Sequence, residues 1–115
     1  MSTINARIIE AATSVVAVCV PDVYRPGAEE TAATEYCTFN CSEIPDCFGD
    51  DGPGAMRYLC QLHYYAPDGT NSLLTRKLLR RALHGAGFTY PSVENASDGE
   101  GQHFVFSFED CDGEV

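Results

Sequence analysis

The sequence has few basic residues and no long apolar run. It carries 7 Lys and Arg against 17 Asp and Glu, which gives a net charge of −10. Wrapping nucleic acid requires a cationic surplus to neutralise phosphates, so this balance excludes that function. No stretch approaches the roughly 20 apolar residues of a membrane span. Residues 11–20 come nearest to a signal-peptide core, but Glu10 abuts them and Pro21-Asp22 is a poor cleavage site, so we expect a cytoplasmic protein.

The sequence also lacks the motifs that carry catalysis. It contains no GxSxG, and no glycine-rich phosphate loop lies between a strand and a helix. Side chains that could exchange protons are present, but nothing in the sequence couples them. They are His63, His84, His103 and the pairs Asp50-Asp51 and Glu109-Asp110. We therefore expect no enzyme activity, no catalytic residue and no cofactor.

Six cysteines would suggest a disulfide framework in a small secreted chain: Cys19, Cys37, Cys41, Cys47, Cys60 and Cys111. Several of them fall where a small apolar residue would pack, Cys19 on a first helix and Cys60 on the core side of a strand. Buried free thiols in a reducing compartment are therefore expected. Zinc held by Cys37, Cys41, Cys47 and His63 is an alternative, but the spacing differs from the common zinc knuckles, so we expect no metal site.

The strongest pattern lies between Met56 and Phe88. Residues 56, 58, 60, 62 and 64 are apolar and alternate with polar residues, which predicts a strand with one covered face. Asp68-Gly69 predicts a turn, Thr70 or Asn71 is expected to cap a helix, and Gly85 is expected to end it.

The expected second helix has an apolar and a basic face. Its apolar stripe is predicted to comprise Leu74, Leu78, Leu79, Ala82 and Leu83. Its basic residues are predicted to gather on the opposite, outward face, and they are Arg76, Lys77, Arg80 and Arg81. These are four of the seven basic residues of an acidic chain, and such segregation favours oriented contact with an acidic surface, although a solvated helix face is the simpler interpretation.

The rest of the sequence predicts a first helix before this unit and a hairpin on either side of its helix. Apolar residues at helical spacing from Ile4 to Cys19 predict a first helix, which Ser2 or Thr3 would cap and Pro21 would end. Residues 21–33 are predicted to form a loop, in which Val23-Tyr24 could add a short strand. A strand over 34–43 is expected to enter an extended hairpin whose acidic tip, 50–54, forms no regular structure. Residues 89–96 and 102–109 predict a closing hairpin, and 110–115 a frayed tail.

These elements predict one α+β domain over residues 1–115. We expect a mostly antiparallel sheet of four to five strands, two helices packed on one face, and an extended hairpin loop. The other face would then expose Tyr36, Leu59, Tyr65 and Val105, and a partly apolar surface of this kind usually meets a partner. An oligomer is the expected consequence.

The order of these elements resembles the tail terminator (tail completion) proteins of long-tailed bacteriophages. The resemblance covers nearly the whole chain and rests on a helix that reads L-x3-LL-x2-AL, a following AGF, and a His before alternating Phe residues. The matching positions are Leu74, Leu78, Leu79, Ala82, Leu83, Ala86, Gly87, Phe88, His103, Phe104, Phe106 and Phe108. The six cysteines are not a feature of this family.

The resemblance implies a structural protein of the virion that is assembled in the host cytoplasm. Such proteins form a homo-oligomeric ring, typically a hexamer, which caps the tail tube, ends its polymerisation and offers a docking surface to the head connector. The implied partners are the tube protein and a head-completion or connector protein. DNA would pass through the bore without specific binding, which suits acidic walls. Neither an enzyme activity nor a cofactor is implied.

The expected interface combines charge with shape. The basic face of Arg76, Lys77, Arg80 and Arg81 would meet acidic residues of a neighbour, and the hairpin tip with Asp50, Asp51 and Gly52 would reach a partner layer. Arg57 and Tyr65 are expected to add contacts from the sheet. A head-completion or neck protein and a tail tube subunit are alternatives, although 115 residues is short for a tube subunit. A small cytoplasmic cysteine-rich binding domain is an alternative of another class.

Overall fold

The computed structural model describes residues 3–27, 32–49, 52–99 and 101–112. These residues form two helices and a five-stranded sheet with strand order β1-β2-β3-β5-β4. The elements are α1 (Ile4–Thr13), β1 (Cys19–Pro21), β2 (Tyr36–Gly49), β3 (Gly52–Ala66), α2 (Leu73–Gly85), β4 (Ser92–Asn95) and β5 (Gln102–Asp112). The α+β class is confirmed.

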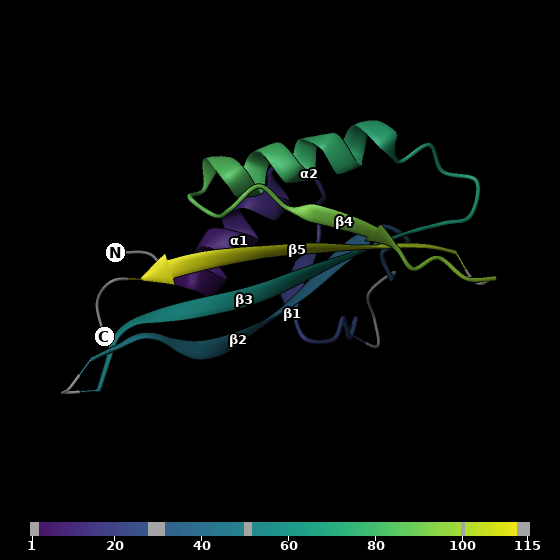
Figure 1. Ribbon diagram of the computed structural model, residues 1–115. Coiled ribbons are helices and arrows are strands. Elements are labelled where there is room, and N and C mark those ends of the chain that lie inside the picture. Colours follow the sequence, from purple (N-terminus) through teal and green to yellow (C-terminus); the bar gives the residue numbers. More distant parts are fainter. Residues whose placement is uncertain (1–2, 28–31, 50–51, 100, 113–115) are drawn as a thin grey trace.

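The described strands form a mixed, mostly antiparallel sheet. β1 pairs with β2 in parallel, whereas β2 with β3, β3 with β5 and β5 with β4 are antiparallel. Both helices lie on one face of this sheet, with α2 above β5 and β4 (Figure 1). The opposite face carries neither helix.

The core lies between the helices and the inner face of the sheet. Side chains alternate along each strand, so every second residue of β2, β3 and β5 points to this layer. Its strand residues are Cys37, Phe39, Cys60, Leu62, Tyr64, Phe104, Phe106 and Phe108, and the helices add Ile8, Ala11, Ala12, Leu79 and Leu83. The predicted inner faces of the long strand and of the Phe strand are thus confirmed.

The first helix is shorter than predicted. The Thr3 side chain accepts a hydrogen bond from Ala6 N, as expected of a cap, but the helix ends at Thr13 with Ser14 as its C-cap. Cys19 belongs to β1 rather than to this helix, and Val23-Tyr24 forms no strand. β1 forms because Cys37 N donates to Val18 O and Asp22 N donates to Phe39 O, pairings that local periodicity does not reveal.

The β2–β3 hairpin is longer and more regular than predicted. Its register runs from Tyr36↔Tyr65 to Gly49↔Gly52, so Gly52, Pro53 and Gly54 belong to β3. The expected irregular structure from 52 to 54 was therefore wrong, whereas the extended hairpin is confirmed. Asp50 and Asp51 lie outside the described residues. Figure 1 shows the arms of β2 and β3 extending past the helical layer.

The C-terminal strand also continues beyond its predicted end. β5 runs to Asp112, and Asp110 accepts hydrogen bonds from the Arg7 guanidinium at 2.9 Å and 3.3 Å. Residues 110–112 are therefore part of the sheet, and the prediction of a frayed tail was wrong for them; 113–115 lie outside the described residues. Asp110 pairs with Tyr58 of β3, and its side chain binds an arginine 103 positions earlier in the chain.

Candidate functional site

The uncovered face of the sheet is the first candidate surface. Strand alternation places four partly exposed groups there, Tyr36, Leu59, Tyr65 and Val105, as the sequence predicted. Arg57 lies on the same face and forms a salt bridge with Glu109 of β5. No helix among the described residues lies on this face of the sheet (Figure 1). This surface, named here the open sheet face, is partly apolar and accessible to a partner.

Aromatic rings form a continuous row at one end of the open sheet face. Tyr24 packs on Tyr36 with ring centroids 4.7 Å apart, and Tyr36 stacks on Tyr65 at 4.8 Å. Tyr65 stacks in turn on His103 at 4.4 Å, and His103 lies 5.1 Å from His63. Because these residues come from three strands and one loop, the row fixes their rings against one another.

The two imidazoles at the end of this row are directly coupled. His63 Nδ1 and His103 Nε2 lie 2.8 Å apart and share one hydrogen bond. Burial, together with the neighbouring His103, lowers the pKa of His63 below its usual range. The sequence had indicated no coupling between histidines. That expectation was wrong because the β3–β5 register pairs His63 with Val105 and Tyr65 with His103, which makes the histidines diagonal neighbours.

Two shallow hollows lie on the open sheet face. One of about 550 Å³ is lined by Asn40, Ser42, Leu59, Gln61, Ser107 and Glu109, among others. The other, of about 460 Å³, is lined by Tyr36, Tyr65, His103 and Asp98, among others. Both have the size of small-ligand sites, but an open sheet with several polar side chains is also suited to receiving another protein.

The outer side of α2 is the second candidate surface. Leu74 and Leu78 are 66% and 40% exposed, and Lys77 and Arg81 are exposed beside them. Leu79 and Leu83 are fully buried beneath the helix. At about 100° per residue, Leu74 lies about 140° and 180° around the axis from them. The predicted stripe was thus wrong for Leu74 and Leu78, which point outward. We name Leu74, Lys77, Leu78 and Arg81 the α2 outer face.

The four basic residues of α2 do not share one face. Arg76 lies over the Phe104 ring at 4.2 Å and donates from Nε to Ser72 Oγ at 3.2 Å. Arg80 lies over the Tyr90 ring at 5.8 Å. Both are partly buried against their own chain, so the prediction of a common outward basic face was wrong for them. Lys77 and Arg81 keep the predicted exposure.

The ends of α2 agree with prediction in part. Ser72 is the N-cap, although Asn71 Oδ1 accepts a hydrogen bond from Leu73 N at 3.4 Å, and Thr70 belongs to the preceding turn. The helix ends at Gly85, as predicted, but the left-handed residue is Gly87, with φ of 101°, and not Gly85. A side chain at Gly87 would meet the Arg7 guanidinium, which explains why glycine occupies this position.

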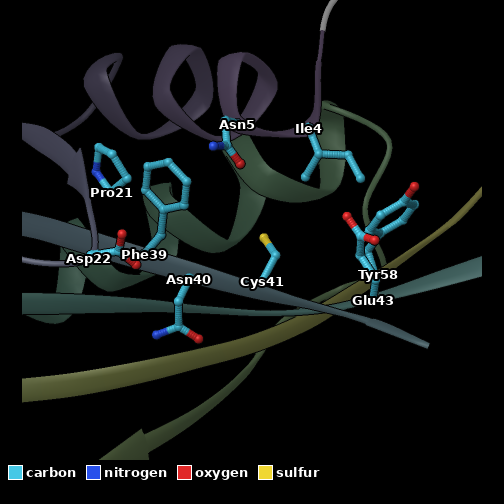
Figure 2. A pocket seen from close by; sticks show the side chains of 9 residues that line it. All are labelled: Ile4, Asn5, Pro21, Asp22, Phe39, Asn40, Cys41, Glu43 and Tyr58. Atoms are coloured by element: carbon cyan, nitrogen blue, oxygen red, sulfur yellow. The ribbon is translucent and has the colours of Figure 1, made fainter.

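A pocket of about 230 Å³ lies on the other side of the sheet, beside α1 (Figure 2). Cys41 points into it, and the carboxylates of Asp22 and Glu43 line it as well. Cys37 and Cys41 belong to this helix-covered side, whereas His63 lies on the open sheet face, so they cannot share the zinc ion considered above. Among the described residues, no three His, Cys, Asp or Glu side chains gather closely enough to hold a metal.

Comparison with known proteins adds no assignment. No protein-family model matches this chain, and no curated protein matches it. Among the described residues no helix has the length and apolar character to cross a membrane. The structure places two predicted interface residues, Arg57 and Tyr65, on the open sheet face and two, Lys77 and Arg81, on the α2 outer face, whereas Arg76 and Arg80 pack against their own chain. Gly52 begins β3, and Asp50 and Asp51 lie outside the described residues.

Proposed function

We propose that this protein is a structural subunit of a phage tail that forms a capping ring on the tail tube, as tail terminator proteins do. The observation that carries the proposal is the pair of uncovered surfaces. The open sheet face and the α2 outer face are both partly apolar. Both helices lie on the other side of the sheet (Figure 1), and the α2 outer face is the side of α2 turned away from the buried Leu79 and Leu83. Neither can cover the other within one chain, but neighbouring copies can pair them.

Head-to-tail contact follows from this arrangement. When two different surfaces of identical subunits meet, the contact is heterologous, and it closes into a ring if the rotation between subunits divides a full turn. Leu74 and Leu78 would enter the hollows of a neighbour's open sheet face. Lys77 and Arg81 would face an acidic neighbour, since the chain carries a net charge of −10. Apolar contact supplies affinity, and charge sets the orientation.

Three further features support a tail terminator in particular. The order of α1, β2, β3, α2, β4 and β5 agrees with the order on which the resemblance rests, to which β1 is an addition. The β2–β3 hairpin extends past the helical layer, where it can contact the tube protein or the head connector. An acidic wall would let DNA pass through the ring without binding. The ring would therefore act by its shape alone: it ends polymerisation by covering the last layer of the tube.

Assembly of the purified chain tests the proposal. Light scattering after size exclusion and negative-stain images are expected to show rings, alone or on tubes grown from the tube protein of the same genome. The double variant Leu74→Glu, Leu78→Glu places two acids on the α2 outer face and is expected to abolish rings and leave tubes of uncontrolled length. Both leucines are exposed, so the fold should persist, which circular dichroism checks.

Ala6→Glu serves as the control, because it adds an acid to an exposed position of the other helix. It should assemble as the unmodified chain does. Reversing Arg76 and Arg80 would be a poor test, since both pack against their own chain. Rings that form equally well in the double variant, or an unmodified chain that stays monomeric and leaves tube length unchanged, would refute the proposal.

A further inference from the structure

Two cysteines face each other across the β2–β3 hairpin. The register pairs Cys41 with Cys60, and both side chains lie on the helix-covered side of the sheet. The neighbouring Cys60 thiol lowers the pKa of Cys41, and the Cys41 thiol, followed by burial, raises the pKa of Cys60. The two sulfur atoms are therefore neighbours in the folded protein.

The hydrogen-bond pattern defines the kind of pair. Cys37 N donates to Val18 O, and Phe39 O accepts from Asp22 N, so odd-numbered residues of β2 direct their backbone groups away from β3. Cys41 is also odd-numbered, so its backbone N–H and C=O groups point away from β3. On β5, Ala96 N donates to His103 O and Thr89 N to Glu109 O, so the even-numbered Phe108, the partner of Cys60, directs its groups to β3. Cys41 and Cys60 thus form a non-hydrogen-bonded pair.

Such a pair suits a disulfide. Its Cα atoms lie about 4.5 Å apart and its side chains are closer than in the hydrogen-bonded kind. A disulfide requires a Cα separation of about 4.4 to 6.8 Å. A bond between Cys41 and Cys60 would therefore need no rearrangement of the hairpin.

The two thiols differ in access. Cys60 is 2% exposed, whereas Cys41 is only partly buried and points into the pocket beside α1 (Figure 2). A reagent in solution can thus reach Cys41 first. Carboxylates of Asp22 and Glu43 line the same pocket, so a cationic reagent should enter more readily than an anionic one.

We propose that Cys41 is a modification site for small, preferably cationic disulfides and that Cys60 resolves the adduct. The Cys41 thiolate attacks one sulfur of the disulfide RSSR, which forms a Cys41–SR bond and releases RS⁻. Cys60 then gives its proton to the released RS⁻ and attacks Cys41 Sγ, which expels the second RS⁻ and forms the Cys41–Cys60 bond; this second RS⁻ takes up the proton that Cys41 had released. Two thiols are oxidised, the reagent is reduced to two RSH, and no further oxidant is required.

The new bond would join the two arms of the hairpin between its first pair, Tyr36↔Tyr65, and its turn. It closes a loop that contains the part of β2 and β3 beyond residues 41 and 60, which extends past the helices (Figure 1). Closing a loop of this size restricts the unfolded chain, so the melting temperature should rise by roughly 5 °C or more. This inference does not depend on ring formation.

Cystamine, a dicationic disulfide, is the probe that tests it. The reduced protein is incubated with cystamine or with anionic oxidised glutathione, then digested without reductant. Mass spectrometry with fragmentation separates Cys37 from Cys41. The expected product is a Cys41–Cys60 cross-link that forms several-fold faster with cystamine. In the unmodified chain, brief iodoacetamide treatment should label Cys41 before Cys37 and Cys60, a result that needs no variant.

Three variants complete the test. Cys60→Ser should accumulate the cysteamine adduct on Cys41, and Cys41→Ser should leave Cys60 unmodified. Cys37→Ala is the matched control, because Cys37 is fully buried and pairs instead with Cys19 of β1, so the 41–60 cross-link should form as before. Labelling of Cys41 no faster than Cys37, a dominant cross-link between other cysteines, or no adduct in Cys60→Ser would overturn the proposal.

Discussion

Single residues tie distant parts of this chain together, and Arg7 does so most clearly. Its guanidinium donates from Nη2 to Ala86 O at 2.9 Å and from Nη1 to Asp110 Oδ2 at 2.9 Å. It also lies over the Phe88 ring at 4.4 Å. One planar cation thus joins α1, the end of α2 and β5, three elements that are separated in sequence.

Arg7→Ala is expected to lower the free energy of unfolding by about 1.5 to 3 kcal/mol, because it removes hydrogen bonds to a charged partner and to a helix carbonyl. Denaturant titration measures this loss. Arg81→Ala, which removes an exposed arginine, is the control and should change stability by about 0.5 kcal/mol or less. Equal effects of the two variants would show that the Arg7 network contributes little.

His63 should make stability depend on pH. Its pKa is lowered in the folded state, so the unfolded chain binds the proton more readily. Stability from this residue is fully present above the ordinary pKa of about 6.5 and is lost as pH falls from there toward the folded value. Thermal melts between pH 7.5 and 5.5, about one unit either side of that pKa, should therefore show a falling melting temperature.

His63→Gln should flatten this dependence, because the titrating group is gone. His84→Gln is the matched control, since His84 lies on α2, outside the pair, and should keep the slope of the unmodified chain. A slope that survives in His63→Gln but disappears in His84→Gln would contradict the assignment.

At the scale of elements, the sequence predicted α2 as a helix correctly but predicted part of its buried side wrongly. Leucines and arginines are mixed around its axis, and both types contain long aliphatic stems that can cover a core. Phe104 and Tyr90 determine which side of α2 faces inward, because Arg76 and Arg80 pack over their rings. With the arginines bound inward, Leu74 and Leu78 turn outward.

Alanine substitutions in α2 test this orientation. Leu79→Ala should cost about 2 to 5 kcal/mol of stability, because it opens a cavity in a fully buried site. Leu78→Ala, the adjacent matched change, should cost no more than about 1 kcal/mol, since the side chain is 40% exposed. Denaturant midpoints distinguish the two variants, and comparable losses would place Leu78 in the core.

At the scale of the whole molecule, charge excludes one class of partner. The net charge is −10, and Lys77 and Arg81 are two exposed cations on a single helix. The chain should therefore not retard duplex DNA in an electrophoretic assay even at about 50 mM salt, where phosphate contacts are strong. A basic DNA-binding protein run alongside provides the positive control, and a salt-sensitive shift by this chain would contradict the expectation.

Local pattern alone determined much of this protein. Alternation placed Cys60, Leu62, Tyr64 and the three Phe residues of β5 in the core, and the turn at Asp68-Gly69, with φ of 84° at Gly69, followed from turn chemistry. These features depend on neighbours close in sequence. The α+β class followed from their order.

Only the tertiary structure decided the features that join distant residues. β1 forms because β2 supplies its backbone hydrogen-bond partners, and β5 extends to Asp112 because β3 pairs with it there, with Arg7 bound to the Asp110 side chain. The His63–His103 and Cys41–Cys60 pairs arise from strand register. Which side of α2 faces inward likewise depended on Phe104 and Tyr90. Sequence periodicity reports what a segment can bury, whereas register and packing determine which side chains meet, and both candidate sites depend on the latter.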